Sequence, residues 1–68
     1  MKNNMRFKNI KLKEFRKKFG FSLNDVSKKT NIDISLLKDI EKGKRDITLS
    51  QLAKLAQLYN KFLTDFFD

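Results

Sequence analysis

The side chains best suited to chemistry in this chain are three cations that lie close together beyond its middle. Lys42, Lys44 and Arg45 flank a glycine. They follow two short stretches, 22–30 and 33–42, whose patterns suggest helices. Ammonium and guanidinium groups are the side chains that proteins commonly use to bind phosphate oxygens. Such a cluster is often no more than solvated surface, but a position directly behind two short helices favours contact with phosphate groups.

Nucleophilic, acid–base and metal chemistry have no evident candidates in this sequence. It has no histidine and no cysteine, so the usual ligands of transition metals and the commonest general base are absent. No obvious base accompanies any of the serines, and Asp39 and Glu41 are two residues apart, which points them to different faces of a helix. There is also no glycine-rich phosphate loop. We therefore expect a protein that is not an enzyme and that uses no metal or other cofactor.

The charge of the chain is high and unevenly distributed. Its 68 residues include 16 Lys and Arg against 8 Asp and Glu, a net charge of +8. Residues 1–45 have 14 basic and 5 acidic side chains (+9), whereas residues 46–68 have 2 and 3 (−1). An asymmetric basic surface of this kind is typical of proteins that bind polyanions.

Polar residues that cap helices mark where the elements that position these cations begin. Ser22 with Asp25, and Thr48 with Gln51, have the spacing of a capping box. Asp33 is a further N-cap residue, because its carboxylate can accept hydrogen bonds from the free N–H groups of a first helical turn. These three caps predict helix starts near residues 22, 33 and 48.

Left-handed backbone is expected where the helices end. Gly20 and Gly43 adopt it without strain, and Asn31 is the kind of non-glycine residue that accepts it most readily. With the apolar spacing, these signals predict five helices: 7–19, 22–30, 33–42, 48–59 and a last one that carries Leu63, Phe66 and Phe67. The residues expected to face inward include Leu12, Phe15, Phe19, Leu49, Leu52, Leu55, Ala56 and Tyr59.

The predicted fold class is a compact all-α domain, since no segment alternates apolar and polar residues over the length of a strand. We expect one domain over residues 1–68, with the basic segment 1–6 a candidate for disorder. Apolar runs are far too short to span a membrane, and we expect a cytoplasmic protein. Residues 7–20 also have the pattern of a basic amphipathic helix that binds membrane surfaces or calmodulin. In so small a chain, we expect that apolar face to be needed in the core.

Residues 20–67, GFSLNDVSKKTNIDISLLKDIEKGKRDITLSQLAKLAQLYNKFLTDFF, resemble the lambda-repressor-like, Xre-type helix-turn-helix family without gaps. The positions that carry the resemblance are Arg16, Gly20, Phe21, Ser22, Leu37, Ile40, the run 41–45, Thr48, Leu49, Leu52, Leu55, Ala56 and Leu58. The resemblance implies a five-helix domain that binds double-stranded DNA. Members are usually homodimeric transcriptional regulators that place the third helix in the major groove.

Carried onto this chain, the resemblance assigns base contacts to the third helix. Ser35 and Lys38 can serve there, the hydroxyl with several bases and the ammonium group with either guanine or phosphate. Ile34 could pack on a thymine methyl group, and Asp39 could accept a hydrogen bond from cytosine N4. The implied phosphate contacts are those of Lys42, Lys44 and Arg45. Lys28 and Lys29 face outward from the second helix, and they either reach phosphate or are plain surface charges.

The family also typically pairs an arginine of the first helix with a glutamate at the end of the third. Arg16 lies on the inward stripe of the first helix, which is an unusual place for a charge. The resemblance implies a bidentate ion pair with Glu41, and the alternative is that both are solvated. We favour the pair, because an unpaired inward charge would be costly. Its expected role is structural, namely to orient the third helix.

Departures from the family pattern keep a second function open. Many members have glutamine at the second residue of the second helix, where this chain has Leu23, and the third helix has few hydrogen-bond donors. Leu23, Ile34 and Leu36 could instead dock a protein partner, as in an antitoxin or a regulatory subunit of the same fold. Between the two, we expect a DNA-binding regulator, most simply a repressor that acts as a homodimer. Phe62 and the Phe66–Phe67 region are candidates for the dimer contact.

Overall fold

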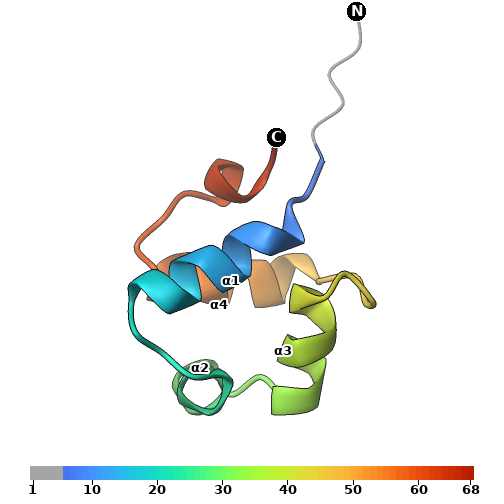
Figure 1. Cartoon of the computed structure of the whole chain (residues 1–68). Helices are drawn as coiled ribbons and strands as arrows, with labels where there is room; N and C mark the ends of the chain where they lie inside the picture. The colour runs from blue at the N-terminus through green and yellow to red at the C-terminus, as the bar shows by residue number, and fades with distance from the viewer. Residues whose placement is uncertain (1–5) are drawn as a thin grey trace, which may run out of the picture.

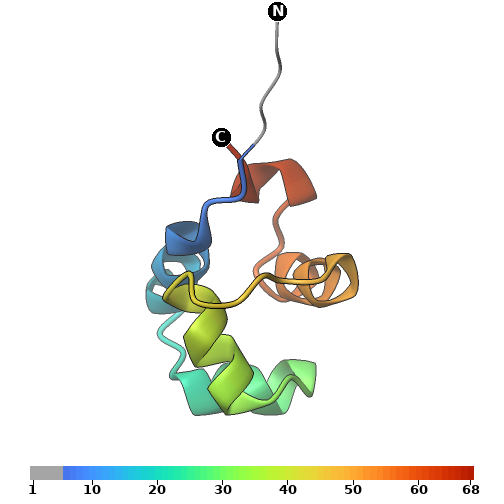
Figure 2. The same cartoon turned by 90° about the vertical axis from the view of Figure 1, so that its right-hand side faces the viewer.

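A computed structural model describes residues 6–68 as an all-helical fold, which confirms the predicted fold class. The elements are α1 (Asn9–Lys18), α2 (Leu23–Thr30), α3 (Ile34–Glu41), α4 (Leu49–Leu58) and a 3-10 helix, η1 (Leu63–Phe66). In Figures 1 and 2, α2 and α3 lie together at one end of the molecule, α1 and α4 cross its middle, and η1 lies near the opposite end. The pair α2–α3 is therefore presented away from the carboxyl terminus.

The predicted caps are present in the structure. Ser22 and Asp25 exchange hydrogen bonds of 3.0 and 2.9 Å between side chain and backbone, and Thr48 and Gln51 do the same at 3.1 and 3.0 Å. The carboxylate of Asp33 accepts from the N–H of Ser35 at 3.0 Å. Each cap satisfies N–H groups that a first helical turn leaves without a partner.

The residues that end α2 and α3 have the expected left-handed backbone conformation. Asn31 has a φ of 62° at the end of α2, and Gly43 has a φ of 77° after α3. Gly43 is also crowded, because a Cβ atom there would lie 3.3 Å from the side-chain Nδ2 of Asn9. A side chain at this position would therefore meet both backbone strain and a close neighbour.

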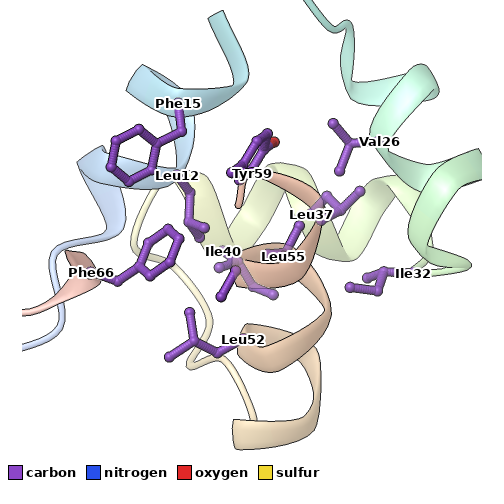
Figure 3. Packing of buried hydrophobic residues seen from close by; sticks show 11 residues of the cluster. Leu12, Phe15, Val26, Ile32, Leu37, Ile40, Leu52, Leu55, Tyr59 and Phe66 are labelled. Carbon is purple, nitrogen blue, oxygen red and sulfur yellow. The ribbon is translucent and has the colours of Figure 1, made fainter. Parts of the chain in front are cut away.

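The core is one cluster of apolar side chains contributed by every helix, and Figure 3 shows them pointing toward one another. Leu12 and Phe15 come from α1, and Leu37 and Ile40 come from α3. From the C-terminal part of the chain come Leu52, Leu55, Ala56, Tyr59 and Phe66, all buried. The ring of Phe66 packs edge-to-face on that of Phe15, with centroids 5.3 Å apart.

Two residues expected in the core are exposed. Leu49 is 71% exposed and is the first residue of α4, one turn before the buried Leu52. Phe19 is 45% exposed because it lies at the C-cap of α1, although its ring still contacts those of Phe21 and Tyr59. For both residues, helical spacing alone was a wrong guide to burial, since they lie at the ends of their helices.

The ends of the described chain pair with each other, which the sequence did not predict. Phe7 and Phe67 form an isolated antiparallel bridge, and their rings pack edge-to-face at 5.7 Å. The N–H of Lys8 donates to Phe66 O, and that of Asp68 donates to Arg6 O, both at 2.8 Å. These bonds hold the chain extended on both sides of the bridge.

This pairing corrects the predicted ends of two helices. The first helix begins at Asn9 rather than at residue 7, and the last is a four-residue 3-10 helix that excludes Phe67. Backbone bonds between distant residues replace those that a longer helix would have made. The expected disorder of residues 1–6 falls outside the described residues except at Arg6, whose carbonyl is bonded.

The single tyrosine offers a spectroscopic test of this core. Tyr59 is 1% exposed, and burial raises its pKa to about 12, with a further contribution from the nearby Glu41 carboxylate. An unfolded tyrosine titrates near pH 10. Because the pKa of Tyr59 is higher in the folded protein than in the unfolded chain, the protonated phenol stabilises the fold. This contribution to the free energy of unfolding is complete below pH 10 and is lost as the pH rises toward 12. We expect phenolate absorbance of the native protein to have a midpoint well above that of the urea-unfolded protein. Equal midpoints would contradict the packing described.

Candidate nucleic-acid interface

The helix-turn-helix formed by α2 and α3 is fixed by side-chain hydrogen bonds in its turn and in the last turn of α2. The hydroxyl of Ser27 donates to Ile32 O at 2.6 Å, and that of Thr30 donates to Val26 O at 2.7 Å. Thr30 Oγ1 also accepts from the N–H of Ile32 at 3.3 Å. Ile32 is 5% exposed, so the turn contributes an apolar side chain to the core as well as a change of direction. The angle between the two helices is therefore held by polar and apolar contacts together.

A bidentate ion pair joins the other end of α3 to α1. Arg16 Nε lies 2.8 Å from Glu41 Oε2, and a terminal guanidinium nitrogen lies 3.0 Å from Oε1. The remaining nitrogen donates to the carbonyl of Phe21 at 3.0 Å, in the loop before α2. Only 12% and 9% of the two side chains are exposed. Hydrogen bonding to Glu41 is the main reason that the pKa of Arg16 is raised.

A second polar contact joins α1 to the end of α3, and no sequence pattern predicts it. Asn9 Nδ2 donates to the backbone carbonyl of Glu41 at 2.7 Å, which satisfies an acceptor at the C-terminal end of α3. Asn9 is the first residue of α1 and has no motif that marks it. It therefore adds a second contact between α1 and Glu41, from the first turn of α1, whereas Arg16 makes the ion pair from the last turn.

The residues predicted to read bases lie on two neighbouring edges of α3. Ser35 and Asp39 are four residues apart on one edge, where Ser35 is exposed and Asp39 half-buried. Ile34 and Lys38 lie on the next edge, and the side chain of Ile34 is 40% exposed. Leu36 is half-buried against the core, so it belongs largely to the packing. The four predicted residues thus form one surface, but Lys38 lies on the edge that leads to Lys42.

The cations after α3 are exposed on a backbone that is hydrogen-bonded to the helix. Lys42, Lys44 and Arg45 are all exposed. The N–H of Lys44 donates to Asp39 O at 2.9 Å, and that of Gly43 donates to Ile40 O at 3.0 Å. The loop therefore begins from a fixed position relative to α3, which allows its cations to act together with the helix.

The two lysines of α2 have different surroundings. Lys28 and Lys29 are both exposed, but Lys29 Nζ lies 5.1 Å from the centroid of the Phe21 ring, within reach of a cation–π interaction. Lys29 also borders a depression shared with Lys54 and Gln57 of α4. The structure therefore places Lys29 beside α4 and not with the cations that follow α3.

A depression of about 240 Å³ lies where α1, α2 and α3 meet. Its lining consists of Ile10, Lys13, Arg16, Leu23, Lys38, Glu41 and Lys42. Lys8 and Lys13 are only five residues apart in the sequence, but the structure separates them. Lys8 pairs with Asp68 at 3.4 Å at the terminal bridge, whereas Lys13 lies beside the cations of α3.

Residues 6–68 contain no group of three or more acidic, histidine or cysteine side chains that could hold a metal ion. No helix among them is both long and apolar enough to cross a membrane.

The ion pair can be tested by removing one charge. Glu41→Gln leaves the Arg16 guanidinium largely buried without its carboxylate, and we expect a loss of about 2–3 kcal/mol in unfolding free energy. Urea denaturation would measure it. Lys8→Gln is the matched control, because its pair with Asp68 is exposed (41% and 63%) and should contribute less than about 1 kcal/mol. Similar losses in both variants would mean that the buried pair does not hold α3 to α1.

Comparison with known families agrees with this geometry. A helix-turn-helix family matches residues 12–66, a stretch that includes most of α1 and the whole of α2, α3 and α4. A search of curated proteins found no match. The family match covers the ion pair, the turn and the basic loop described above, and the fold agrees with it. The chain belongs to the Xre/lambda-repressor-like helix-turn-helix family.

Proposed function

We propose that this protein is a sequence-specific regulator of transcription that binds double-stranded DNA through α3. Membership of the helix-turn-helix family points to a DNA-binding regulator. The observation that carries the proposal is the exposed edge of α3 followed directly by Lys42, Lys44 and Arg45 on a loop bonded to the helix. A helix that enters a major groove needs cations beside it to hold the phosphate backbone.

The proposed contacts divide into those that position the protein and those that select a sequence. Lys42, Lys44 and Arg45 would bind phosphates and supply affinity that falls with salt. Ser35 and Lys38 would contact base edges. Ile34 and Asp39 are secondary, the first through a thymine methyl group and the second through cytosine N4.

Of the lysines on α2, Lys28 is the better candidate for a phosphate contact. Lys29 is held near the Phe21 ring and beside α4, which leaves it less available to the DNA bound by α3. The acidic Asp33 opposes the approach of phosphate, but its carboxylate is engaged at the N-cap of α3. The positive loop after α3 would therefore dominate the local field.

A repressor that acts as a homodimer is part of this proposal. One α3 helix contacts only a short half-site, and family geometry pairs two such helices on a two-fold operator. Phe62 is 79% exposed and Leu63 is 39% exposed at the start of η1, which supports this end of the molecule as the dimer contact. We also propose that the protein acts in the cytoplasm and that it catalyses no reaction.

The alternative of a protein-docking surface formed by Leu23, Ile34 and Leu36 is less well supported. Leu23 and Leu36 are half-buried and pack against the core. Ile34 is therefore the one exposed member of that set, at 40%. This packing favours DNA as the partner of the α3 surface.

Selection from a random duplex pool at near-physiological salt tests the function directly. We expect enrichment of a two-fold motif whose half-sites are separated by about one helical turn, ~34 Å. Ser35→Ala should shift the preferred bases within each half-site while DNA is still retained. Retention of the pool without any enriched sequence would contradict sequence-specific binding.

The phosphate contacts predict a change in salt dependence. Lys44→Ala should weaken binding to all duplexes similarly and reduce the slope of log K against log salt by about 1. Fluorescence anisotropy with the selected duplex and an unrelated duplex would measure it. Lys54→Ala, which removes an exposed lysine of α4, is the control and should change neither slope. A loss confined to the selected duplex would instead make Lys44 a base reader.

A further inference from the structure

The depression between α1, α2 and α3 has an apolar floor that DNA binding does not explain. Ile10, in the first turn of α1, is 49% exposed, and it lines the depression together with Leu23 of α2. Neither side chain can pair with a phosphate group. Ile10 is exposed and Leu23 is half-buried beside it, and an apolar surface of this kind in a recess more often indicates a place where another molecule binds.

The rim of the same depression is positively charged. Lys13 comes from α1, and Lys38 and Lys42 come from the adjoining edge of α3. Arg16 and Glu41 also line it, but they are bonded to each other at 2.8 and 3.0 Å, so the one carboxylate of the lining is already paired. An occupant therefore meets three ammonium groups around an apolar surface and a neutralised ion pair.

These features select the chemistry of the occupant. A phosphate backbone would satisfy the ammonium groups but leave Ile10 and Leu23 in contact with water. A purely apolar ligand would cover the floor but leave three like charges close together. The volume of about 240 Å³ is below the roughly 300–1,000 Å³ usual for small-molecule sites, which suits one inserted side chain.

We propose that this depression binds an acidic segment of a partner protein. One aliphatic or aromatic side chain of the segment packs on Ile10 and Leu23, and flanking carboxylates pair with Lys13, Lys38 and Lys42. Charge complementarity steers such a segment toward the basic end of the molecule and gives it orientation. The apolar anchor supplies affinity that salt does not screen.

Binding of this segment would regulate the proposed DNA contact. Lys38 and Lys42 belong both to the rim of the depression and to the surface assigned to DNA. The two partners therefore compete for the same cations, and the acidic segment displaces DNA. This competition rests on the proposed function, whereas the binding of the segment does not.

A display selection on a library of random peptides, with no DNA present and at near-physiological salt, tests the binding. We expect the enriched peptides to combine carboxylates with one large apolar residue. Ile10→Ser should weaken a selected peptide about tenfold, because it removes the floor without touching the core. Ile34→Ser is the matched control: Ile34 is similarly exposed (40%) but does not line the depression. It should leave the affinity unchanged.

Several outcomes would overturn the proposal. If no acidic peptide were enriched, the depression would not bind an acidic segment. If a glutamate homopeptide bound as tightly as the selected peptides, the binding would be unspecific electrostatic attraction. Peptides that bind Ile10→Ser as well as the native protein would place the site elsewhere. If the peptide binds as proposed but selected DNA does not displace it, the regulatory step is wrong. Failure of the protein to select any DNA would instead count against the proposed function and leave the peptide result standing.

Discussion

The ion pair between Arg16 and Glu41 is the interaction on which the rest of the functional surface depends. One guanidinium group binds both carboxylate oxygens at the end of α3 and also the carbonyl of Phe21 before α2. It therefore links three segments that must keep fixed positions if α2 and α3 are to act as a unit. Because both side chains are largely buried, the pair stabilises the arrangement only when it is complete.

Polar contacts of this kind compensate for a small core. A domain of this size buries only about 60% of the surface of its unfolded chain. Much of the remaining specificity comes from side chains that bond to the backbone. Ser27 fixes the turn between α2 and α3, and Asn9 satisfies a carbonyl at the end of α3. Both bonds act at the ends of helices, where the backbone has unpaired groups.

The basic and the apolar surfaces of the molecule meet around α3. Its exposed edge and the following loop are suited to a polyanion, whereas the recess beside it combines Ile10 and Leu23 with three lysines. Leu23 stands where many family members have a polar residue, and its position over this recess gives the departure a physical consequence. Leu23 forms part of the apolar floor of that recess.

The sequence by itself determined the helices, their caps and the turn. Ser22, Asp33 and Thr48 form their caps through neighbours three residues away or closer, and Asn31 sets its own backbone angle. Such features depend on local chemistry and can be predicted without knowing the fold. The pairing of Arg16 with Glu41 was accessible only through the family resemblance, since 25 residues separate the two.

Tertiary structure alone decided the features that join distant parts of the chain. The bridge between Phe7 and Phe67, the bond from Asn9 to Glu41 and the placement of Lys13 beside Lys42 have no local signal. Helical spacing also overestimated the burial of Leu49 and Phe19, because periodicity gives the direction of a side chain but not where the helix stops covering the core. These contacts form when packing brings separate segments together, so the shape of the candidate site emerges only in the folded molecule.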